Sequence, residues 1–365
     1  MQPLRVGIIG LGNISGIYFE NLKKYSATEI VAVADIDADR AATVAAKHGI
    51  AKSLTPQQLV EDSDVELVLN LTIPGAHYSV QKLAVENGKH VYTEKPLTAE
   101  RAEAAEILEL AAKNGVRVGG APDTFLGGGH QACREVIAQG LIGDVIGSHC
   151  FMLCHGHESW HPAPEFYYRK GGGPMFDMGP YYLTALVNMI GPVSRVTGST
   201  RVTFPTRTIT SQPKAGTVID VEVPTHVAGI MDFANGAVGE ITTTFDVWHS
   251  MVPPILIYGS EGSLAVPDPN GFGGEPKIRL RGESEWRDLP VEFGFTGNAR
   301  GVGVLDMAYA IRNGGDHRAS GDLAFHVLDV MHAFHESSDA GRHIEIGSKP
   351  AQPAIMARDQ YADLI

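Results

Sequence analysis

Cysteine is scarce in this sequence, and long apolar runs are missing. The 365 residues include only three cysteines, Cys133, Cys150 and Cys154, whose odd number and spacing match neither a disulfide framework nor a C-x-x-C zinc site. No run approaches the roughly 20 apolar residues that span a bilayer. The N-terminus lacks the charged and apolar regions of a secretory signal, so we expect a cytoplasmic protein.

Basic residues are in deficit as well. Lysine and arginine number 29 against 42 aspartate and glutamate residues, which gives a formal net charge of −13, and the acidic residues are scattered. Nucleic acids and anionic membranes attract a basic face, so we expect neither as a partner. Glycine, in contrast, is abundant with 42 residues, which indicates many tight turns and close backbone approaches.

The first 121 residues alternate between strand-like and helix-like segments. Five apolar segments, typical of strands in a parallel sheet that is covered on both faces, span residues 4–10, 29–35, 66–72, 89–94 and 116–120. Amphipathic segments separate them at residues 13–25, 36–49, 75–88 and 98–115. This order predicts an α/β architecture that begins with a doubly wound Rossmann domain over residues 1–121.

Beyond residue 121 the pattern changes to long β-type stretches. After one helix at 130–140, we expect strands at residues 144–155, 194–204, 222–233, 237–248 and 255–259. Two helices, at 301–314 and 322–338, close the chain. We therefore predict an α+β domain over residues 122–365 with a large, mostly antiparallel open sheet. Its outer face needs a cover, which favours a homo-oligomer through this sheet.

The turn after the first strand carries a form of the dinucleotide-binding fingerprint, G-x-G-x-x-S. It reads Gly10-Leu11-Gly12-Asn13-Ile14-Ser15. Gly10 allows a tight turn, and Gly12 lets the backbone approach a pyrophosphate at the helix N-terminus. The alternative is a plain strand–turn–helix connection. The second strand ends in Asp35, at the spacing where a carboxylate binds the adenosine ribose, which favours a dinucleotide site.

Asp35 and Asp37 also bear on the choice of cofactor. A 2′-phosphate would meet two carboxylates and no arginine before Arg40, which lies a turn into the following helix, so we expect NAD rather than NADP. Asp37 has an alternative role as the N-cap of that helix, and the preference therefore depends mainly on Asp35.

Further motifs lie along the chain. They are Thr72-Ile73-Pro74 with His77, Glu94-Lys95-Pro96, the segment GGGPMFDMGPY at 171–181, and residues 319–341. Together with the fingerprint they resemble the glucose–fructose oxidoreductase/inositol dehydrogenase/MocA (Gfo/Idh/MocA) family over nearly the whole chain. The resemblance implies an NAD(P)-dependent oxidoreductase that acts on sugars, cyclitols or their derivatives.

The fingerprint and the resemblance together imply cofactor contacts where the strands of the Rossmann domain end. We expect these contacts at Gly10, Gly12, Asn13, Ile14, Asp35, Thr72, Ile73, Pro74, His77, Glu94 and Lys95. For His77 the alternative is a satisfied histidine at the start of a helix.

The family's catalytic lysine falls on Lys95. An ammonium at the end of a strand would stabilise the alkoxide that develops as a secondary alcohol loses its hydride. Tyr181 replaces the histidine of most members, and Asp177 precedes it by four residues, on one face of the same helix. We expect Tyr181 to act as general base, with its pKa of about 10 lowered by Lys95, and Asp177 to orient the substrate or the lysine. The alternatives are a core tyrosine and a Lys95–Glu94 salt bridge.

A segment rich in histidine and aromatic residues precedes the glycine-rich motif. The expected substrate-binding residues are His157, Trp160, His161, Tyr168, Asp177 and Arg300. Trp160 offers an apolar platform to a sugar ring, while histidine and tyrosine offer partners to hydroxyls. The alternative is ordinary packing of strand and loop aromatics. His155 and His157 would share one face of a strand, as zinc ligands do, but no carboxylate has ligand spacing and we expect no metal.

Three functions compete on this sequence. The first is an NAD-dependent dehydrogenase that oxidises a ring hydroxyl of a sugar, polyol, cyclitol or glycoside, with the 3-hydroxyl as one candidate. The second, which rests on the resemblance, is glycoside cleavage assisted by transient oxidation at carbon 3, with NAD recycled. The third is a non-catalytic NAD-sensing protein, against which the presence of Lys95 and Asp177 argues.

Overall fold

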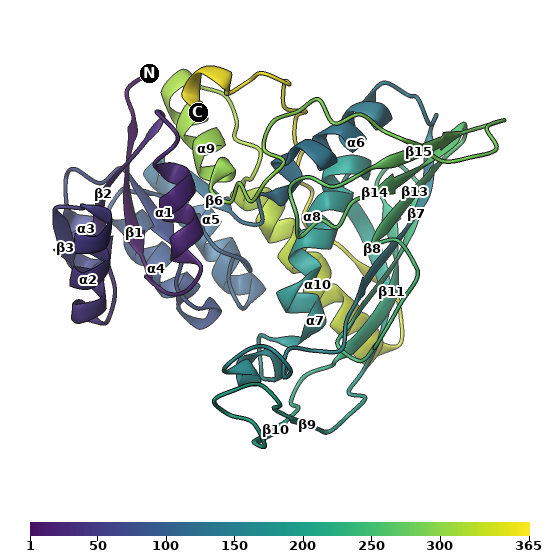
Figure 1. Cartoon of the computed structure of the whole chain (residues 1–365), viewed down its shortest axis with the longest axis horizontal. Coiled ribbons are helices and arrows are strands. Elements are labelled where there is room, and N and C mark those ends of the chain that lie inside the picture. The colour runs from purple at the N-terminus through teal and green to yellow at the C-terminus, as the bar shows by residue number, and fades with distance from the viewer. The chain divides into compact units, whose positions relative to one another are not determined.

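A computed structural model describes residues 1–365, and their contacts divide the chain into two compact units (Figure 1). The first unit comprises Met1–Leu126, Gly297–Phe325 and Met356–Ile365, and the second comprises Gly127–Thr296 and His326–Ile355. These units differ from the contiguous ranges 1–121 and 122–365 expected from the sequence, because two C-terminal segments return to the first unit.

Polar contacts hold the returning segments in the first unit. Arg312, in helix α9 (Val302–Asn313), donates to Glu66 at 2.7 Å. The buried carboxylate of Asp306 pairs with Arg318 and accepts the hydroxyl of Tyr361. Arg312 lies 246 residues from Glu66, and Tyr361 lies 55 residues from Asp306, so local patterns do not show that these segments belong to the Rossmann unit.

The first unit contains a six-stranded parallel sheet in the order β3-β2-β1-β4-β5-β6. Its strands are β1 (Leu4–Ile9), β2 (Thr28–Ala34), β3 (Lys52–Leu54), β4 (Leu67–Asn70), β5 (His90–Thr93) and β6 (Val118–Gly120). The connecting helices are α1 (Ser15–Leu22), α2 (Ala38–His48), α3 (Pro56–Glu61), α4 (Pro74–Glu86) and α5 (Arg101–Asn114). The predicted doubly wound fold is confirmed, and its strand order reverses between β1 and β4, where such sheets bind ligands.

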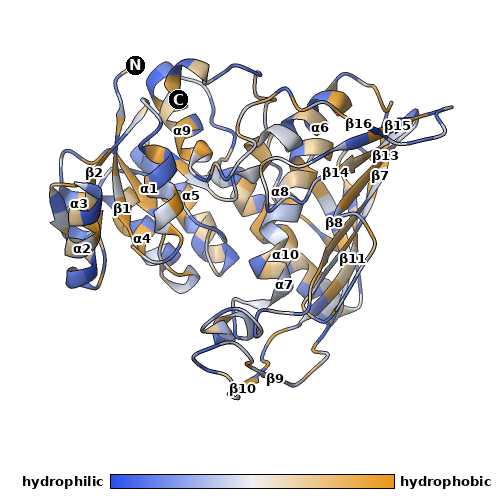
Figure 2. Ribbon diagram, in the orientation of Figure 1, coloured by the Kyte–Doolittle hydropathy of each residue, from blue (hydrophilic) through white to orange (hydrophobic).

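Local sequence signals account for these elements. Strand β1 is apolar and buried, whereas α2 and α3 carry many hydrophilic residues (Figure 2). Helix α2 begins where Asp37 accepts the Arg40 N–H, and it ends at Gly49, whose φ of 69° suits glycine. Sequence analysis missed β3 and α3 because three strand residues are too few to show a period. The capping box of Thr55 and Gln58 was the available signal for α3.

The second unit is built on a nine-stranded sheet in the order β16-β15-β14-β13-β7-β12-β11-β8-β17. Its strands are β7 (Val145–Leu153), β8 (Val193–Arg201), β11 (His226–Phe233), β12 (Val238–Thr244), β13 (Ile255–Gly259), β14 (Gly262–Val266), β15 (Lys277–Leu280), β16 (Arg287–Asp288) and β17 (Ile344–Glu345). Only the β7–β12 pair is parallel, so the expectation of a mostly antiparallel sheet is confirmed. Strands β9 (Thr206–Thr208) and β10 (Val218–Asp220) form a separate pair.

Four helices accompany this sheet, and none in the chain combines the length and apolar character needed to cross a lipid bilayer. They are α6 (Gly128–Ala138), α7 (Gly173–Asp177), α8 (Gly179–Ile190) and α10 (Gly321–Ala340), the last of which begins in the first unit. Helix α8 carries no charged residue, and every one of its residues is buried. A helix that is uncharged and buried on all sides lies inside a core, so Tyr181 is carried by a fixed element.

Candidate functional site

The fingerprint turn has the shape that a dinucleotide requires. Gly10 adopts a φ of 93°, and a Cβ there would lie 2.6 Å from the backbone of Leu71 and of Thr72. Only glycine therefore lets β1 turn so close to the chain that follows β4. A Cβ on Gly12 would meet no atom within 4 Å, and Gly12 and Asn13 are exposed. The turn thus presents open backbone at the reversal point of the sheet, where a pyrophosphate fits.

Asp35 fixes this turn and lies beside an arginine. Its Oδ2 accepts the Leu11 N–H at 2.8 Å, and its Oδ1 accepts the Asp37 N–H at 3.0 Å. The guanidinium of Arg40 lies 3.4 Å from Asp35 and 3.3 Å from Asp37. Sequence analysis placed Arg40 away from the ribose site, but one helical turn brings its long side chain back to Asp35. The position expected from the sequence to bind the ribose therefore carries a cation as well as two carboxylates.

Exposed isoleucines line the edge where the strands of the first unit end. Ile14 follows β1, Ile36 follows β2 with 96% of its surface exposed, and Ile73 follows β4 with 74% exposed. Thr72 is half-buried and Pro74 is exposed beside Ile73. Apolar side chains at such a position suit the flat rings of a dinucleotide. Sequence analysis named Ile14 and Ile73 but missed Ile36, although an apolar residue directly after Asp35 was visible.

Hydrogen bonds hold the segment that carries Lys95. The carboxylate of buried Glu94 accepts the Tyr18 hydroxyl at 2.8 Å and the Lys95 N–H at 3.0 Å, and its own N–H donates to Asn70 at 2.9 Å. The Leu97 carbonyl accepts from Gln81 at 2.6 Å. The half-buried Lys95 is thus attached to a backbone that is fixed on both sides. Tyr18 and Gln81 were not anticipated because their partners are 76 and 16 residues away.

His77 connects the two segments expected at the cofactor. Its ring is fully buried, with Nδ1 2.7 Å from the Pro96 oxygen and Nε2 3.0 Å from the Thr72 oxygen. Burial lowers the pKa of His77, and the two carbonyl oxygens oppose that shift. The imidazole therefore ties the end of β4 to the end of β5, which places Thr72 and Lys95 at one edge of the sheet.

The loop before α9 is anchored by a carboxylate that sequence analysis missed. Asp123 is buried, and its Oδ2 accepts the N–H groups of Gly301 at 2.8 Å and Gly303 at 2.9 Å. Burial raises the pKa of Asp123 to about 6 even though these N–H groups oppose the shift. Arg300, expected at the substrate, lies in this loop in the first unit, where its Nη1 donates to Asn298 at 2.9 Å.

In the second unit the structure brings Asp177 and His157 together. The Nε2 of His157 lies 3.5 Å from the Asp177 carboxylate, and both side chains are largely buried. Asp177 ends α7, and α8 begins at Gly179, so Asp177 and Tyr181 do not share one continuous helix as expected. Met178, which takes a φ of −108°, interrupts the helix between them. Tyr181 is buried in the first turn of α8 with 7% of its surface exposed.

Aromatic rings surround His157. Tyr167 stacks on its imidazole at a centroid distance of 3.8 Å, and Trp160 lies 5.3 Å away with 62% of its surface exposed. His161 contacts Tyr167 edge-on at 5.4 Å. We call the rings of His157, Trp160, His161 and Tyr167 the aromatic wall. Tyr168, in contrast, is fully buried and donates its hydroxyl to Glu158, so it lies behind this wall. The sequence prediction named Tyr168 and not Tyr167. Two adjacent tyrosines look alike in sequence, and no local pattern shows which of them faces His157.

The two histidines of the His-x-His motif have different surroundings. Strand β7 ends at Leu153, and Gly156 takes a φ of 76°, so strand alternation does not extend to this motif. His155 stacks on Trp248 at 3.4 Å, whereas His157 stacks on Tyr167. The prediction that the two rings share one face is therefore wrong. No group of three or more His, Cys, Asp or Glu side chains is placed to hold a metal ion.

Two family models match this chain. Residues 4–120 match the model described as "Oxidoreductase family, NAD-binding Rossmann fold", and residues 130–265 match the "GFO/IDH/MocA C-terminal domain". The matched ranges contain the fingerprint turn, Lys95 and the Asp177–Tyr181 segment.

Individual proteins are similar over most of the chain. Myo-inositol 2-dehydrogenase from Thermotoga maritima is 25% identical over 262 residues, which cover 72% of this chain and 74% of the relative. D-xylose 1-dehydrogenase (NADP(+)) 2 from Haloferax volcanii is 23% identical over 346 residues, 93% of this chain and 99% of the relative. A solved structure, levoglucosan dehydrogenase in complex with NADH and levoglucosan, has a TM-score of 0.81 at 20% identity, covering 95% and 100% of the two chains.

Replacing Gly12 by alanine is expected to weaken NADH binding while leaving the fold intact. The new Cβ meets no protein atom within 4 Å, but it occupies the space through which a pyrophosphate approaches the backbone. We expect the Kd for NADH to rise at least about tenfold, measured by fluorescence titration. Gly10→Ala is the matched control, because its Cβ meets the chain after β4 and should lower the free energy of unfolding by about 1–3 kcal/mol. Unchanged NADH affinity in folded Gly12→Ala would place the pyrophosphate elsewhere.

Replacing Asp35 by serine is expected to move the cofactor preference toward NADP. The change removes the carboxylate that would repel a 2′-phosphate and leaves the Arg40 guanidinium free of that partner. We expect the ratio of kcat/KM for NADP to that for NAD to rise about tenfold or more. Adding Arg40→Ala should cancel this gain. A ratio that stays constant in Asp35→Ser would show that Asp35 does not face the ribose.

Proposed function

The chain belongs to the GFO/IDH/MocA family of NAD-binding oxidoreductases, and from this premise we propose that it oxidises a secondary ring hydroxyl of a sugar, cyclitol or glycoside. The bound NAD supplies the acceptor for the hydride. The relatives support this substrate class, since their names specify myo-inositol, D-xylose and levoglucosan as the compounds on which they act.

The observation that carries the proposal is the fixed backbone around Lys95. Glu94 and Pro96 are held by Tyr18 and His77, so the lysine leaves a rigid strand end rather than a mobile loop. A lysine that only solvates the protein surface does not require its backbone to be held by buried hydrogen bonds. A fixed ammonium suits a reaction in which negative charge develops on a substrate oxygen, because a preorganised cation needs no reorganisation during the step.

Lys95, Asp177 and Tyr181 have distinct roles in the proposed reaction. Lys95 would stabilise the alkoxide as the hydride leaves for NAD, and Tyr181, in its phenolate form, would accept the hydroxyl proton as general base and become a neutral phenol. Asp177 orients the substrate, and the His157 imidazole 3.5 Å from its carboxylate holds it in place. Trp160, exposed on the same aromatic wall, supports one face of the sugar ring. We further propose that the open sheet of the second unit joins copies of the chain into a homo-oligomer.

A screen of monosaccharides, inositols and glycosides with NAD tests the function. We expect at least one compound to produce NADH, detected by its absorbance. Release of free aglycone without net NADH would instead indicate glycoside cleavage with transient oxidation and recycled cofactor. A panel that gives neither NADH nor aglycone, with cofactor bound, would favour a non-catalytic NAD-binding protein and overturn the proposal.

Replacing Tyr181 by phenylalanine is expected to remove the general base. Because the ring remains in the buried helix α8, the fold and the Kd for NADH should stay unchanged while kcat falls by about 10²–10⁴. Steady-state kinetics with the best compound of the screen measure the change. Tyr182→Phe is the matched control, since this neighbouring buried tyrosine points its hydroxyl at Asp268. Full turnover in Tyr181→Phe would remove this residue from the mechanism.

A further inference from the structure

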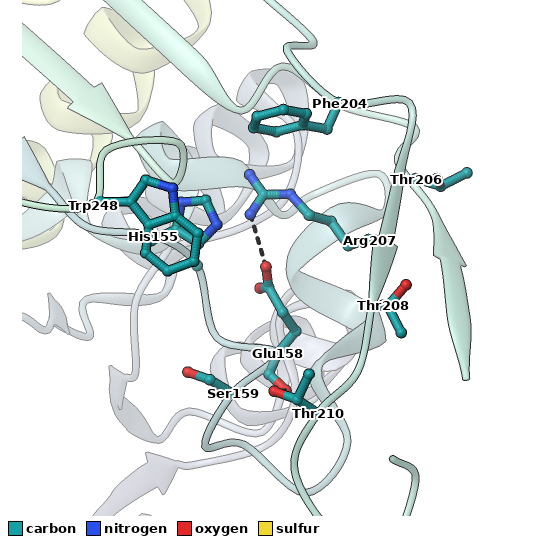
Figure 3. A pocket seen from close by; sticks show the side chains of 10 residues that line it. His155, Glu158, Ser159, Phe204, Thr206, Arg207, Thr208, Thr210 and Trp248 are labelled. Carbon is teal, nitrogen blue, oxygen red and sulfur yellow. Dashed lines mark hydrogen bonds and ion pairs between the residues drawn. The ribbon is translucent and has the colours of Figure 1, made fainter. Parts of the chain in front are cut away.

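The second unit contains a pocket that the proposed reaction does not use. It has a volume of about 580 Å³ and lies between the segment from His155 to Ser159, strand β9 and Trp248 (Figure 3). None of the residues expected at the substrate from sequence lines it. The pocket is large enough for a ring-sized ligand.

A buried ion cluster forms one wall of the pocket. Arg207 has 5% of its surface exposed, and it donates to Glu158 at 2.7 Å and to the Phe245 carbonyl at 2.9 Å. A second carboxylate, that of Asp246, also pairs with Arg207. Burial alone would raise the pKa of Glu158, but the bonds from Tyr168 and Arg207 lower it, so the carboxylate stays ionised. One guanidinium thus faces two carboxylates, and the wall has no surplus positive charge with which to attract an anion.

Aromatic rings form the opposite wall. The Trp248 indole stacks on His155 at 3.4 Å and 14°, yet 71% of its surface is exposed. Figure 3 shows this stacked pair facing Arg207 and Glu158. Phe204 lies beside them, with the Arg207 guanidinium 5.1 Å from its ring. Hydroxyl groups of Ser159 and Thr208 complete the lining.

This combination fits a neutral sugar ring. An exposed indole that a second ring supports from behind offers a flat apolar platform to the C–H face of a pyranose. The ionised Glu158 and the serine and threonine hydroxyls accept or donate hydrogen bonds to hydroxyls. A phosphorylated ligand would be repelled, because the two carboxylates of Glu158 and Asp246 outnumber the single guanidinium of Arg207. The pocket is also preorganised, because hydrogen bonds to several protein partners hold Arg207 and Glu158 in place without a ligand.

The pocket is adjacent to the aromatic wall of the candidate active site. His157 turns toward Asp177, while its neighbours Gly156 and Glu158 line the pocket. Consecutive Cα atoms are about 3.8 Å apart, so one short segment contributes to two binding surfaces. The ring of Phe245 contacts His157 at 4.6 Å, and its carbonyl accepts from Arg207, which also links the two surfaces.

We propose that this pocket is a subsite for a second sugar ring, one that is linked to the ring undergoing oxidation. The preferred substrate is then a disaccharide or another two-ring glycoside rather than a free monosaccharide. This inference rests on the proposed function for the identity of the first ring, whereas binding of a sugar to the pocket can be tested without any oxidation.

Binding is tested by intrinsic fluorescence of the full-length protein without NAD. Cellobiose, maltose, lactose and glucose are titrated into the native protein and into Trp248→Ala. We expect a saturable change with at least one disaccharide, at a concentration at least tenfold below that needed for glucose, and its loss in Trp248→Ala. Trp286→Ala, which changes a tryptophan outside the pocket, is the control and should keep the change. No saturable change with any disaccharide, or one that survives in Trp248→Ala, would overturn the subsite.

Kinetics separate this inference from the proposed function. For a sugar that the native enzyme oxidises, we expect a disaccharide containing it to have at least tenfold higher kcat/KM than its methyl glycoside. Trp248→Ala should remove that advantage and leave kcat/KM for the methyl glycoside within twofold. An equal loss for both compounds would overturn the subsite. Saturable disaccharide binding without oxidation of any sugar would uphold the pocket and reject the dehydrogenase.

Discussion

The ties between the ends of strands β4 and β5 are the constraint on which the first unit's site depends. His77 joins the Thr72 and Pro96 carbonyls, and Tyr18 joins Glu94 to the first helix. The Tyr18 hydroxyl and the His77 ring are buried, where leaving a polar group without a partner costs about 1–3 kcal/mol. The same bonds that complete the fold thus fix the lysine, so stability and positioning have one origin.

In the second unit, buried charge serves a comparable purpose. Arg207 bonds Glu158, Asp246 and a carbonyl, and Glu158 receives Tyr168 as well. Charges taken out of water are tolerated only when each has partners, so the cluster permits few arrangements of the loops that supply it. The loop between β7 and α7 therefore has a defined path although it contains little regular structure.

The sequence allowed the local features to be predicted and concealed the distant ones. Strand β1, the turn at Gly10 and the carboxylate of Asp35 carry short-range patterns, and the structure contains each of them where expected. Asp123 anchors residues that are 178 and 180 positions away, and Arg207 pairs with a residue 49 positions away. No period or motif encodes such pairs, because they form only when the chain folds. The roles of Lys95, Asp177 and Tyr181 in the reaction remain predictions.

The absence of charge from helix α8 has a consequence for synthesis of the chain. Gly179 lies against Met331 of α10, and a Cβ added at Gly179 would approach the Met331 sulfur to 3.4 Å. Helix α10 begins 131 residues after α8 ends (321 − 190), because β8 to β16 and α9 lie between them in the sequence. It bonds to β8 through Ser337. Nascent α8 therefore emerges from the ribosome long before its final cover, and an incomplete chain exposes an apolar helix to chaperones and to aggregation.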